Sequence, residues 1–473
     1  MIVPFPASKT HISVPAGAHA SVLELIGNTP LVRVGGLDTG LCELYLKLES
    51  QNPGGSIKDR IALSMVEAAE AAGYIKPGDT LVEATAGNTG LGLTLVASQK
   101  GYKLVLVIPD KMSQEKIFHM KAMGAQVVMT RSDVLRGHPD YYQDKARAIA
   151  ASIPNAFYVN QFENPANPEA HEVTTAPELW AQMGGNIDAI VCGVGSGGTL
   201  TGIGRFFKAV SPETKMILAD PQGSVLAPYA EHGIMIEPGS WLVEGIGEDF
   251  IPLNCELSYV SQAYTIPDSE SISTARDVLT HEGILCGSSS GTLIAAALKY
   301  CRAQKEPKRV VTFVCDSGNK YLSKIYNPYW LNDQGLTATP APDDTVKDLI
   351  ARPYKSGDVV FVSPDETLQQ VYAKMKMFDV SQVPVIENDA IRGLIDEADV
   401  LMTVMGNPGG FMASASQVMS DKLAKIDAAK PITDLLPIFE KGRVASVVDN
   451  GKFLGLVTPI DFLNHLRKRT GKV

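Results

Sequence analysis

The chain has 473 residues, of which 42 are basic and 52 acidic, so its formal net charge is −10. This length predicts about three structural units, and the acidic charge disfavours general binding to nucleic acids or anionic membranes, which leaves small molecules as the expected partners. No apolar run approaches the roughly 18 residues of a membrane span, and the N-terminal stretch lacks a basic flank followed by an apolar region, so we expect a cytoplasmic protein without a secretory signal.

The six cysteines offer no redox or metal motif, because no two of them are spaced as C-x-x-C. Reduced, mostly buried thiols are therefore expected. The histidines and cysteines form no recognisable ligand set, and we predict no metal site.

From about residue 20 to 330, short β-branched runs alternate with longer Ala-rich segments. The clearest predicted strands are Leu104–Ile108, Val127–Met129, Ile190–Cys192, Met216–Ala219 and Val310–Val314. The clearest predicted helices are Ile61–Ala72, Leu91–Gln99 and Ser271–Leu279. Strands that are apolar on both faces indicate buried parallel sheets covered by helices, so the predicted fold class is α/β.

The first motif with chemical content is the segment Asn52–Arg60, which opens a predicted helix. Ser56 is a candidate N-cap, and Asp59 stands where a capping carboxylate belongs. Lys58 then lies in the first helical turn, where a cation opposes the helix dipole. A lone lysine would be read as a solvated surface residue, but Pro53 and the two following glycines bring the backbone close to a partner of the amine.

The segment Thr85–Gly90 follows the predicted strand Leu81–Ala84 and precedes a helix. Such a turn directs backbone N–H groups and small hydroxyls at an anion, and a carboxylate is the expected ligand. An ordinary strand-to-helix turn is the alternative interpretation.

The glycine-rich segment Gly193–Thr199 follows the strand Ile190–Cys192 and predicts a phosphate site at the start of the next helix. Its glycines also satisfy the dinucleotide spacing G-x-G-x-x-G. However, no acidic residue closes a following strand as a ribose partner would, unless Asp220 does so. A monophosphate is therefore ranked ahead of a dinucleotide.

The C-terminal part contains an internal repeat after a Gly, Pro and Thr-rich linker at 331–344. Ile391–Leu401 resembles Phe453–Leu463, with an offset of 62 residues. Each copy follows a helix and an apolar strand, Leu368–Met377 with Val383–Ile386 and Ile432–Glu440 with Ala445–Val448. We predict a tandem of βαββα units.

Together with CGSSSG (286–291), NQFENPANPEAH (160–171), VEGIGEDFIP (243–252) and CDSGNKYLSK (315–324), these motifs stand in a recognisable order. The chain resembles pyridoxal-phosphate enzymes of fold type II, the tryptophan-synthase β type, in the cystathionine β-synthase and O-acetylserine sulfhydrylase family. The repeats resemble a pair of CBS domains. The expected domains are an arm at 1–20, a catalytic domain at 21–330, the linker, and CBS domains at 345–408 and 413–473.

The resemblance implies a role for each matching residue. Lys58 would carry pyridoxal 5'-phosphate and act as general base, Asn88 would bind its ring hydroxyl, and Ser289 would face its pyridine nitrogen. The phosphate would be bound by Gly195, Ser196, Gly197, Gly198 and Thr199. The amino-acid substrate would be bound by Thr85, Ala86, Asn88, Thr89 and Gln161, with Glu244, Gly245 and Glu248 at the thiol acceptor. No haem is expected, because only about twenty residues precede the catalytic region.

The implied reaction joins serine and homocysteine into cystathionine, with sulfide-releasing side reactions. A serine opposite the ring nitrogen makes the ring a weaker electron sink than an aspartate would, which suits elimination. One departure is Glu248, where animal synthases carry a tyrosine. Cysteine synthase, which combines O-acetylserine with sulfide, is the alternative, and a catalytically silent adenosyl-ligand sensor is a third hypothesis.

The CBS pair implies an adenosyl ligand, with Phe378, Asp379, Thr458 and Asp461 as candidate contacts. Asp396 replaces the expected Thr or Ser in the first copy and would repel phosphates, which favours S-adenosylmethionine over ATP. The alternative is that the pair only mediates contacts in a homodimer or homotetramer.

Overall fold

The computed structural model of the chain describes residues 17–85, 87–110, 112–131, 133–134, 137–336, 344–355, 357, 359–407, 409–420 and 423–469. Most of the expected arm at 1–20 and half of the linker at 331–344 lie outside these ranges. The contacts divide the chain into unit 1, Met1–Tyr326, and unit 2, Asn327–Val473.

Unit 1 contains a four-stranded, fully parallel sheet in the order β5-β4-β3-β6. Its strands are Thr80–Ala84 (β3), Lys103–Pro109 (β4), Gln126–Thr130 (β5) and Ala156–Tyr158 (β6). Every residue of β3 is buried, as expected for a strand with helices on both faces. The helices next to this sheet are Asn88–Lys100 (α2), Gln114–Ala122 (α3) and Tyr142–Ser152 (α4).

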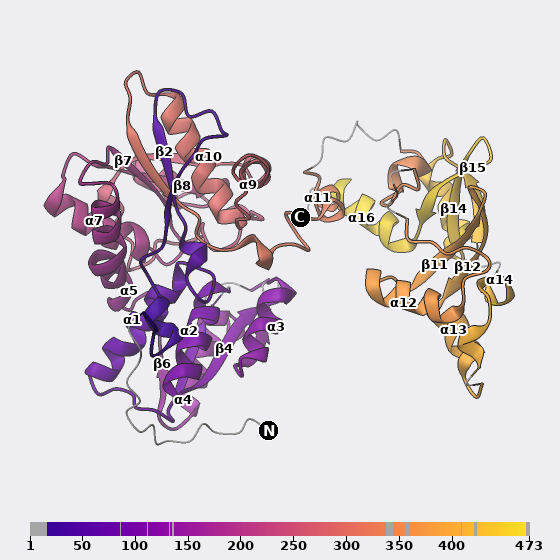
Figure 1. Cartoon of the computed structure of the whole chain (residues 1–473), viewed down its shortest axis with the longest axis horizontal. Coiled ribbons are helices and arrows are strands. Elements are labelled where there is room, and N and C mark those ends of the chain that lie inside the picture. Colours follow the sequence, from indigo (N-terminus) through magenta and orange to yellow (C-terminus); the bar gives the residue numbers. More distant parts are fainter. Residues whose placement is uncertain are drawn as a thin grey trace. The chain divides into compact units, whose positions relative to one another are not determined.

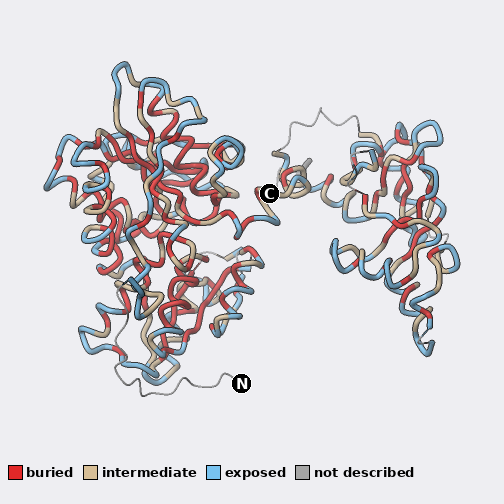
Figure 2. Tube along the Cα trace, viewed as in Figure 1, coloured by how far each residue is buried: buried red, intermediate tan, exposed pale blue. Residues whose placement is uncertain are grey.

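The second sheet of unit 1 has six strands in the order β1-β2-β10-β7-β8-β9. They are Leu31–Arg33 (β1), Glu43–Lys47 (β2), Ala189–Gly193 (β7), Lys215–Pro221 (β8), Val260–Ile266 (β9) and Arg309–Phe313 (β10). Only the pairing of β1 with β2 is antiparallel. The predicted α/β class with buried parallel sheets is confirmed, and Figure 2 shows the buried residues in red through the interior of unit 1.

Helices surround the two sheets (Figure 1). They include Lys58–Ala71 (α1), Ala166–Ala170 (α5), the π-helical turn His171–Thr175 (η3), Ala176–Gln182 (α6), Gly198–Val210 (α7), Leu226–His232 (α8), Asp268–Glu282 (α9) and Ser288–Arg302 (α10). The start of α1 packs tightly on α2, because a Cβ at Gly92 would lie 3.0 Å from the carbonyl oxygen of Lys58. No described helix combines the length and the apolar character needed to cross a bilayer.

Unit 2 begins with a short helix, Pro328–Asp333 (α11), and contains the two predicted copies. The first has Leu368–Phe378 (α12), Gln382–Glu387 (β11), Ala390–Asp396 (β12) and Glu397–Val404 (α13). The second has Leu423–Asp427 (β13), Leu436–Phe439 (α15), Val444–Asp449 (β14), Lys452–Val457 (β15) and Pro459–Arg469 (α16). In the first copy the place of the predicted opening strand is taken by Val362, which forms an isolated parallel β-bridge with Val385. Each copy packs around a hydrophobic core, that of the second copy also includes Val346 and Leu349, and a smaller cluster joins Ile386 and Ile391 with Phe453.

Candidate active site

The sequence motifs of unit 1 meet at the carboxyl ends of β3, β7 and β10, the usual place for ligand sites in parallel sheets. Ser56 forms a β-bridge with Asp316, which joins the loop before α1 to the segment after β10. Asn88, the first residue of α2, donates a hydrogen bond to the same Asp316 at 2.7 Å. Segments that lie more than 200 residues apart are thus brought together around Lys58.

Helix α1 begins at Lys58, as the sequence predicts for the first turn. The backbone N–H of Lys58 donates to Ser56 Oγ at 3.3 Å. The carboxylate of Asp59 accepts from the N–H of Gly54 at 2.6 Å and so secures the glycine turn. Burial lowers the pKa of the Lys58 amine, although Cys315, Asp316 and Glu248 oppose the shift. A lowered pKa favours an amine that can act as nucleophile and base.

The predicted carboxylate site is a cluster of hydroxyl and amide groups beside β3. Thr85 Oγ1 accepts from the N–H groups of Gly87 and Gly90, which leaves its own O–H free to donate. Thr89 donates to Gln161 Oε1 at 2.6 Å, and Gln161 Nε2 donates to the carbonyl of Ala84 at 3.1 Å. Thr85, Thr89 and Gln161 thus lie together, whereas Ala86 lies outside the described residues.

Glu83 is a buried carboxyl group next to this cluster. Its Oε1 accepts from the backbone N–H of Gln161 at 3.3 Å. Burial raises the pKa of Glu83 to about 8. The group is therefore mostly neutral near pH 7, which spares an incoming carboxylate a repelling charge.

The glycine-rich loop before α7 is enclosed on one side by the protein backbone. A Cβ at Gly195 would lie 2.6 Å from the carbonyl oxygen of Gly245, and one at Gly197 would lie 2.7 Å from Cα of Cys255. A Cβ at Gly198 would collide with Asn167 Oδ1 at 1.9 Å. The first N–H groups of α7 lack partners within the helix and are available to an anion.

Two buried side chains, Asn167 and His171, contact the glycine-rich loop and the start of α7. Asn167 Nδ2 donates to Ser196 Oγ at 2.9 Å and to the carbonyl of Gln161 at 2.7 Å, which connects the phosphate loop with the carboxylate site. His171 Nε2 lies 3.2 Å from Thr199 Oγ1, and burial holds the pKa of His171 well below its usual range.

Ser289 lies buried in the first turn of α10. Its neighbour Ser290 accepts from the N–H of Cys315 at 2.9 Å. Burial raises the pKa of the Cys315 thiol to about 12, against the effects of Lys58 and of a hydrogen bond with Ser289. Ser289 and Lys58 thus both lie near Cys315.

The two predicted acceptor-site glutamates have different surroundings. Glu244 is bound by two lysines, Lys116 and Lys324, each at 2.6 Å. Burial opposes its charge, but these lysines hold the pKa of Glu244 below its usual value. Glu248 instead points toward the phosphate loop, since its Oε1 lies 3.9 Å from the place of a Cβ at Gly195. Its charge also opposes the lowering of the Lys58 pKa.

Sequence reasoning assigned no role to four residues of this site. Asp316, Lys320 and Tyr321 all lie in the segment CDSGNKYLSK, and Lys116 lies on α3. Tyr321 donates to Asp316 Oδ2 at 2.7 Å and accepts from Lys116 Nζ at 3.0 Å. The sequence did contain a signal for three of them, because Asp316, Lys320 and Tyr321 are polar residues that follow the buried strand β10.

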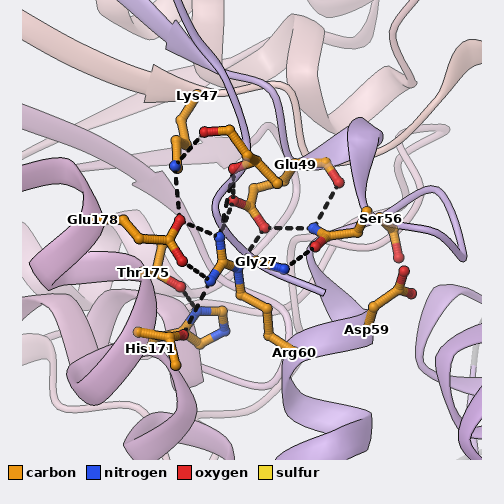
Figure 3. Close-up of polar contacts among 12 residues, drawn as sticks. Gly27, Lys47, Glu49, Ser56, Asp59, Arg60, His171, Thr175 and Glu178 are labelled. Atoms are coloured by element: carbon orange, nitrogen blue, oxygen red, sulfur yellow. Dashed lines mark hydrogen bonds and ion pairs between the residues drawn. The ribbon is translucent and has the colours of Figure 1, made fainter. Parts of the chain in front are cut away.

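A buried ionic network lies beneath α1 (Figure 3). Arg60 makes bidentate bonds to Glu49, at 2.8 Å each, and to Glu178, at 2.7 Å each. Lys47 also donates to Glu178, at 2.9 Å. Burial opposes the charge of Arg60, but Glu178 and Glu49 raise its pKa further above its usual value. The network fixes α1 two residues after Lys58.

In unit 2, Thr458 and Asp461 form a helix-capping pair at the start of α16. Thr458 Oγ1 donates to Asp461 Oδ2 at 2.6 Å, and the backbone N–H of Thr458 donates to the same oxygen at 2.7 Å. Phe378 and Asp379 end α12 and are exposed. Among the described residues, no hydrogen bond, ion pair or ring contact joins these two pairs.

Comparisons with known proteins agree with this architecture. Residues 22–316 match the model of the family "Pyridoxal-phosphate dependent enzyme", and residues 342–406 and 415–468 each match the CBS domain. A cystathionine beta-synthase of Dictyostelium discoideum is 36% identical over 471 residues, which cover 96% of this chain and 93% of that protein.

Two further relatives are shorter. Cysteine synthase 1 of Emericella nidulans is 41% identical over 335 residues, or 69% of this chain and 90% of its own length. The crystal structure of an O-acetylserine dependent cystathionine beta-synthase from Helicobacter pylori has a TM-score of 0.61 and 38% identity, covering 66% of this chain and 99% of its own. The chain therefore belongs to the family of fold type II pyridoxal-phosphate dependent enzymes, in the group of cystathionine β-synthases and cysteine synthases, and carries a tandem pair of CBS domains.

Proposed function

We propose that this chain catalyses a β-replacement in which serine loses its hydroxyl group and homocysteine adds through its thiol, giving cystathionine. The observation that carries the proposal is the extent of the similarity. The cystathionine beta-synthase relative covers 96% of this chain and therefore extends over both units, whereas the cysteine synthase relative covers 69% of it.

Pyridoxal phosphate is the cofactor of this family, and the residues of the site fit it. Three glycines in the loop before α7 leave no room for side chains and present backbone N–H groups to a phosphate. Lys58 supplies an amine with a lowered pKa, Asn88 supplies an amide donor, and Ser289 supplies a hydroxyl in place of a carboxylate. When bound, the cofactor withdraws electrons from the substrate carbon that carries the amino group.

The residues of the chain would then have separate tasks. Thr85, Thr89 and Gln161 would bind the carboxylate of the amino-acid substrate and orient it. Lys58 would hold the cofactor, remove the proton from Cα and deliver a proton to the departing hydroxyl oxygen. Glu248 would attract the ammonium group of homocysteine, a group that sulfide lacks.

Cysteine synthase activity is the second candidate. It is favoured by the higher identity to the fungal cysteine synthase and by the similarity to the Helicobacter pylori enzyme, which depends on O-acetylserine. The two are separated by offering the protein serine or O-acetylserine together with equal concentrations of homocysteine and sulfide, and by quantifying products by mass spectrometry. Cystathionine in excess from serine supports our proposal; cysteine as the main product from O-acetylserine contradicts it.

CBS domains often bind adenosyl ligands, and pyridoxal-phosphate enzymes of this family act on amino acids. For this chain the finer proposal is S-adenosylmethionine at the CBS pair, with Thr458 and Asp461 in the second copy as contacts. We also propose a homodimer or homotetramer as the assembled form.

A further inference from the structure

Lys320 is a buried lysine whose three N–H donors are all engaged inside the active site. It ends the short 3-10 turn Gly318–Lys320 (η5) and is 8% exposed. Its Nζ donates to the carbonyl oxygens of Gly54 at 3.2 Å and Gly55 at 3.0 Å, and to Asn88 Oδ1 at 2.9 Å. An ammonium group has three donors, so this set of acceptors is complete.

These contacts fix the orientation of the Asn88 amide. An ammonium group cannot accept a hydrogen bond, so the atom of Asn88 that faces Lys320 is the oxygen. A carboxylate cannot donate one, so the atom that faces Asp316 at 2.7 Å is the nitrogen. One N–H of that amide nitrogen remains to donate to a ligand.

Asp316 is itself held from the opposite side. Tyr321 donates to the same carboxylate oxygen at 2.7 Å, and Lys116 on α3 donates to Tyr321 at 3.0 Å. The amide of Asn88 is therefore held on both sides: its oxygen accepts from the Lys320 ammonium group, and its nitrogen donates to the Asp316 carboxylate. Although Asp316 Oδ1 has no hydrogen-bond partner, these contacts through Oδ2 restrict the Asn88 amide to one arrangement.

We propose that Lys320 is a positioning residue that aims the free N–H of Asn88 at the ring oxygen of the cofactor and ties Asn88 to the loop before Lys58. The inference rests on the proposed function. Gly54 and Gly55 precede Lys58 by a few residues, and Asn88 begins α2, so one ammonium group sets the spacing between the two cofactor contacts. Burial lowers the pKa of Lys320, with Asp316 opposing the shift, and this agrees with its enclosed position.

The test compares cofactor binding by full-length protein from which the cofactor has been removed. Lys320→Met keeps the length of the side chain and removes its donors, and the exposed Lys305→Met is the matched control. Pyridoxal phosphate affinity is measured by absorbance titration, and the cofactor band of each loaded variant is followed against pH. We expect Lys320→Met to bind about 10- to 100-fold more weakly, as for the loss of a charged hydrogen bond, and its band to titrate at a different pH from wild type.

A double-variant cycle separates positioning from mere packing. If Lys320 acts through Asn88, Lys320→Met in an Asn88→Ala background weakens affinity by no more than about threefold further. Lys320→Gln, which keeps two N–H donors, serves for the same comparison if Lys320→Met does not fold. Wild-type affinity and band in the Lys320 variants, or full additivity with Asn88→Ala, would overturn the inference. Wild-type protein that binds no pyridoxal phosphate would instead overturn the proposed function.

Discussion

Lys58 has surroundings that suit a nucleophile and a proton carrier. Its pKa is lowered chiefly by burial, and groups on two other segments, Cys315 with Asp316 and Glu248, oppose this shift. The amine itself contributes no apolar packing, since α1 is anchored by Arg60 and by Ile61, Met65 and Val66 in the core. The proposed chemical role of this helix and its structural role thus belong to different residues.

Lys58→Ala is expected to lower turnover by about three orders of magnitude or more, because it removes the covalent attachment point and the proton carrier together. Its circular dichroism and thermal unfolding should match wild type. Lys305→Ala, at an exposed position, controls for the loss of a lysine. Turnover at the wild-type rate in Lys58→Ala would exclude this residue from the chemistry.

Glu83 provides a prediction about pH. Its folded-state pKa is raised to about 8, so the stability that its neutral form contributes is fully present below about pH 4.5 and is lost as the pH rises through about 8. Ionisation also places a negative charge beside the carboxylate site. We expect the Michaelis constant for serine to rise above pH 8 in the wild type and to rise less in Glu83→Gln. Parallel pH profiles for the two proteins would show that Glu83 does not influence substrate binding.

At the scale of elements, the active site depends on how helix starts are held. Helix α1 is fixed by the Arg60 network, α2 by Asn88 in the Lys320 contacts, and α10 by Ser288, which accepts from the N–H of Glu244 at 3.0 Å. Lys58, Asn88 and Ser289 thus each lie in the first turn of a helix whose partners lie on another segment.

Glu178→Gln tests the network under α1. Hydrogen bonds to Arg60 overcome the effect of burial and lower the pKa of Glu178 to about 2. The depressed pKa contributes stability that is present above about pH 4.5 and is lost as the pH falls through about 2, worth up to about 3 kcal/mol. The variant should be less stable at pH 7 and should lose less stability than wild type between pH 5 and pH 3.

Tryptophan fluorescence during denaturant unfolding measures this effect, since Trp180 lies on α6 two residues from Glu178 and Trp241 also lies in unit 1. Glu306→Gln, at an exposed position, is the control. Equal stability of Glu178→Gln and wild type at both pH values would contradict an energetic role for the network.

The sequence was sufficient for the periodic elements but not for long-range polar contacts. The apolar runs predicted β4, β7, β8 and β10 within one or two residues, because buried parallel strands have a strong compositional signal. The partnership of Lys320 with Asn88 has no such signal, since the residues are 232 positions apart. The predicted capping of α1 by Ser56 is wrong, because the N-cap residue is Ile57 and no side chain caps the helix. The Asp59 carboxylate accepts from the N–H of Gly54 instead.

At the scale of the whole molecule, unit 1 holds the residues of the proposed chemistry and unit 2 the residues of the proposed adenosyl site. The two copies in unit 2 use the same device at the start of their last helix. Asp399 accepts from the N–H of Asp396 at 3.0 Å, as Asp461 does from that of Thr458. The two copies differ in the residue before this helix, which is Asp396, with a carboxylate, in the first copy and Thr458, with a hydroxyl, in the second.

This difference predicts that the second copy carries the ligand contact. Isothermal titration of S-adenosylmethionine, AMP and ATP is expected to show binding of the first, because the carboxylates of both copies disfavour phosphates. Asp461→Ala should weaken it about tenfold, as for the loss of a hydrogen bond to a charged group, and Asp399→Ala, its counterpart in the first copy, should not. If titration of none of the three ligands produces a heat of binding, the CBS pair does not bind an adenosyl ligand and the prediction is wrong.

The central claim is that Lys58 drives β-replacement on serine. In the most direct measurement, full-length protein loaded with pyridoxal phosphate is mixed with homocysteine and with serine that carries carbon-13 at its β-carbon. The label is then followed by mass spectrometry. We expect labelled cystathionine from wild type and none from Lys58→Ala over the same time. Unlabelled or absent cystathionine from a yellow, loaded wild-type protein, or equal product from both proteins, would contradict it.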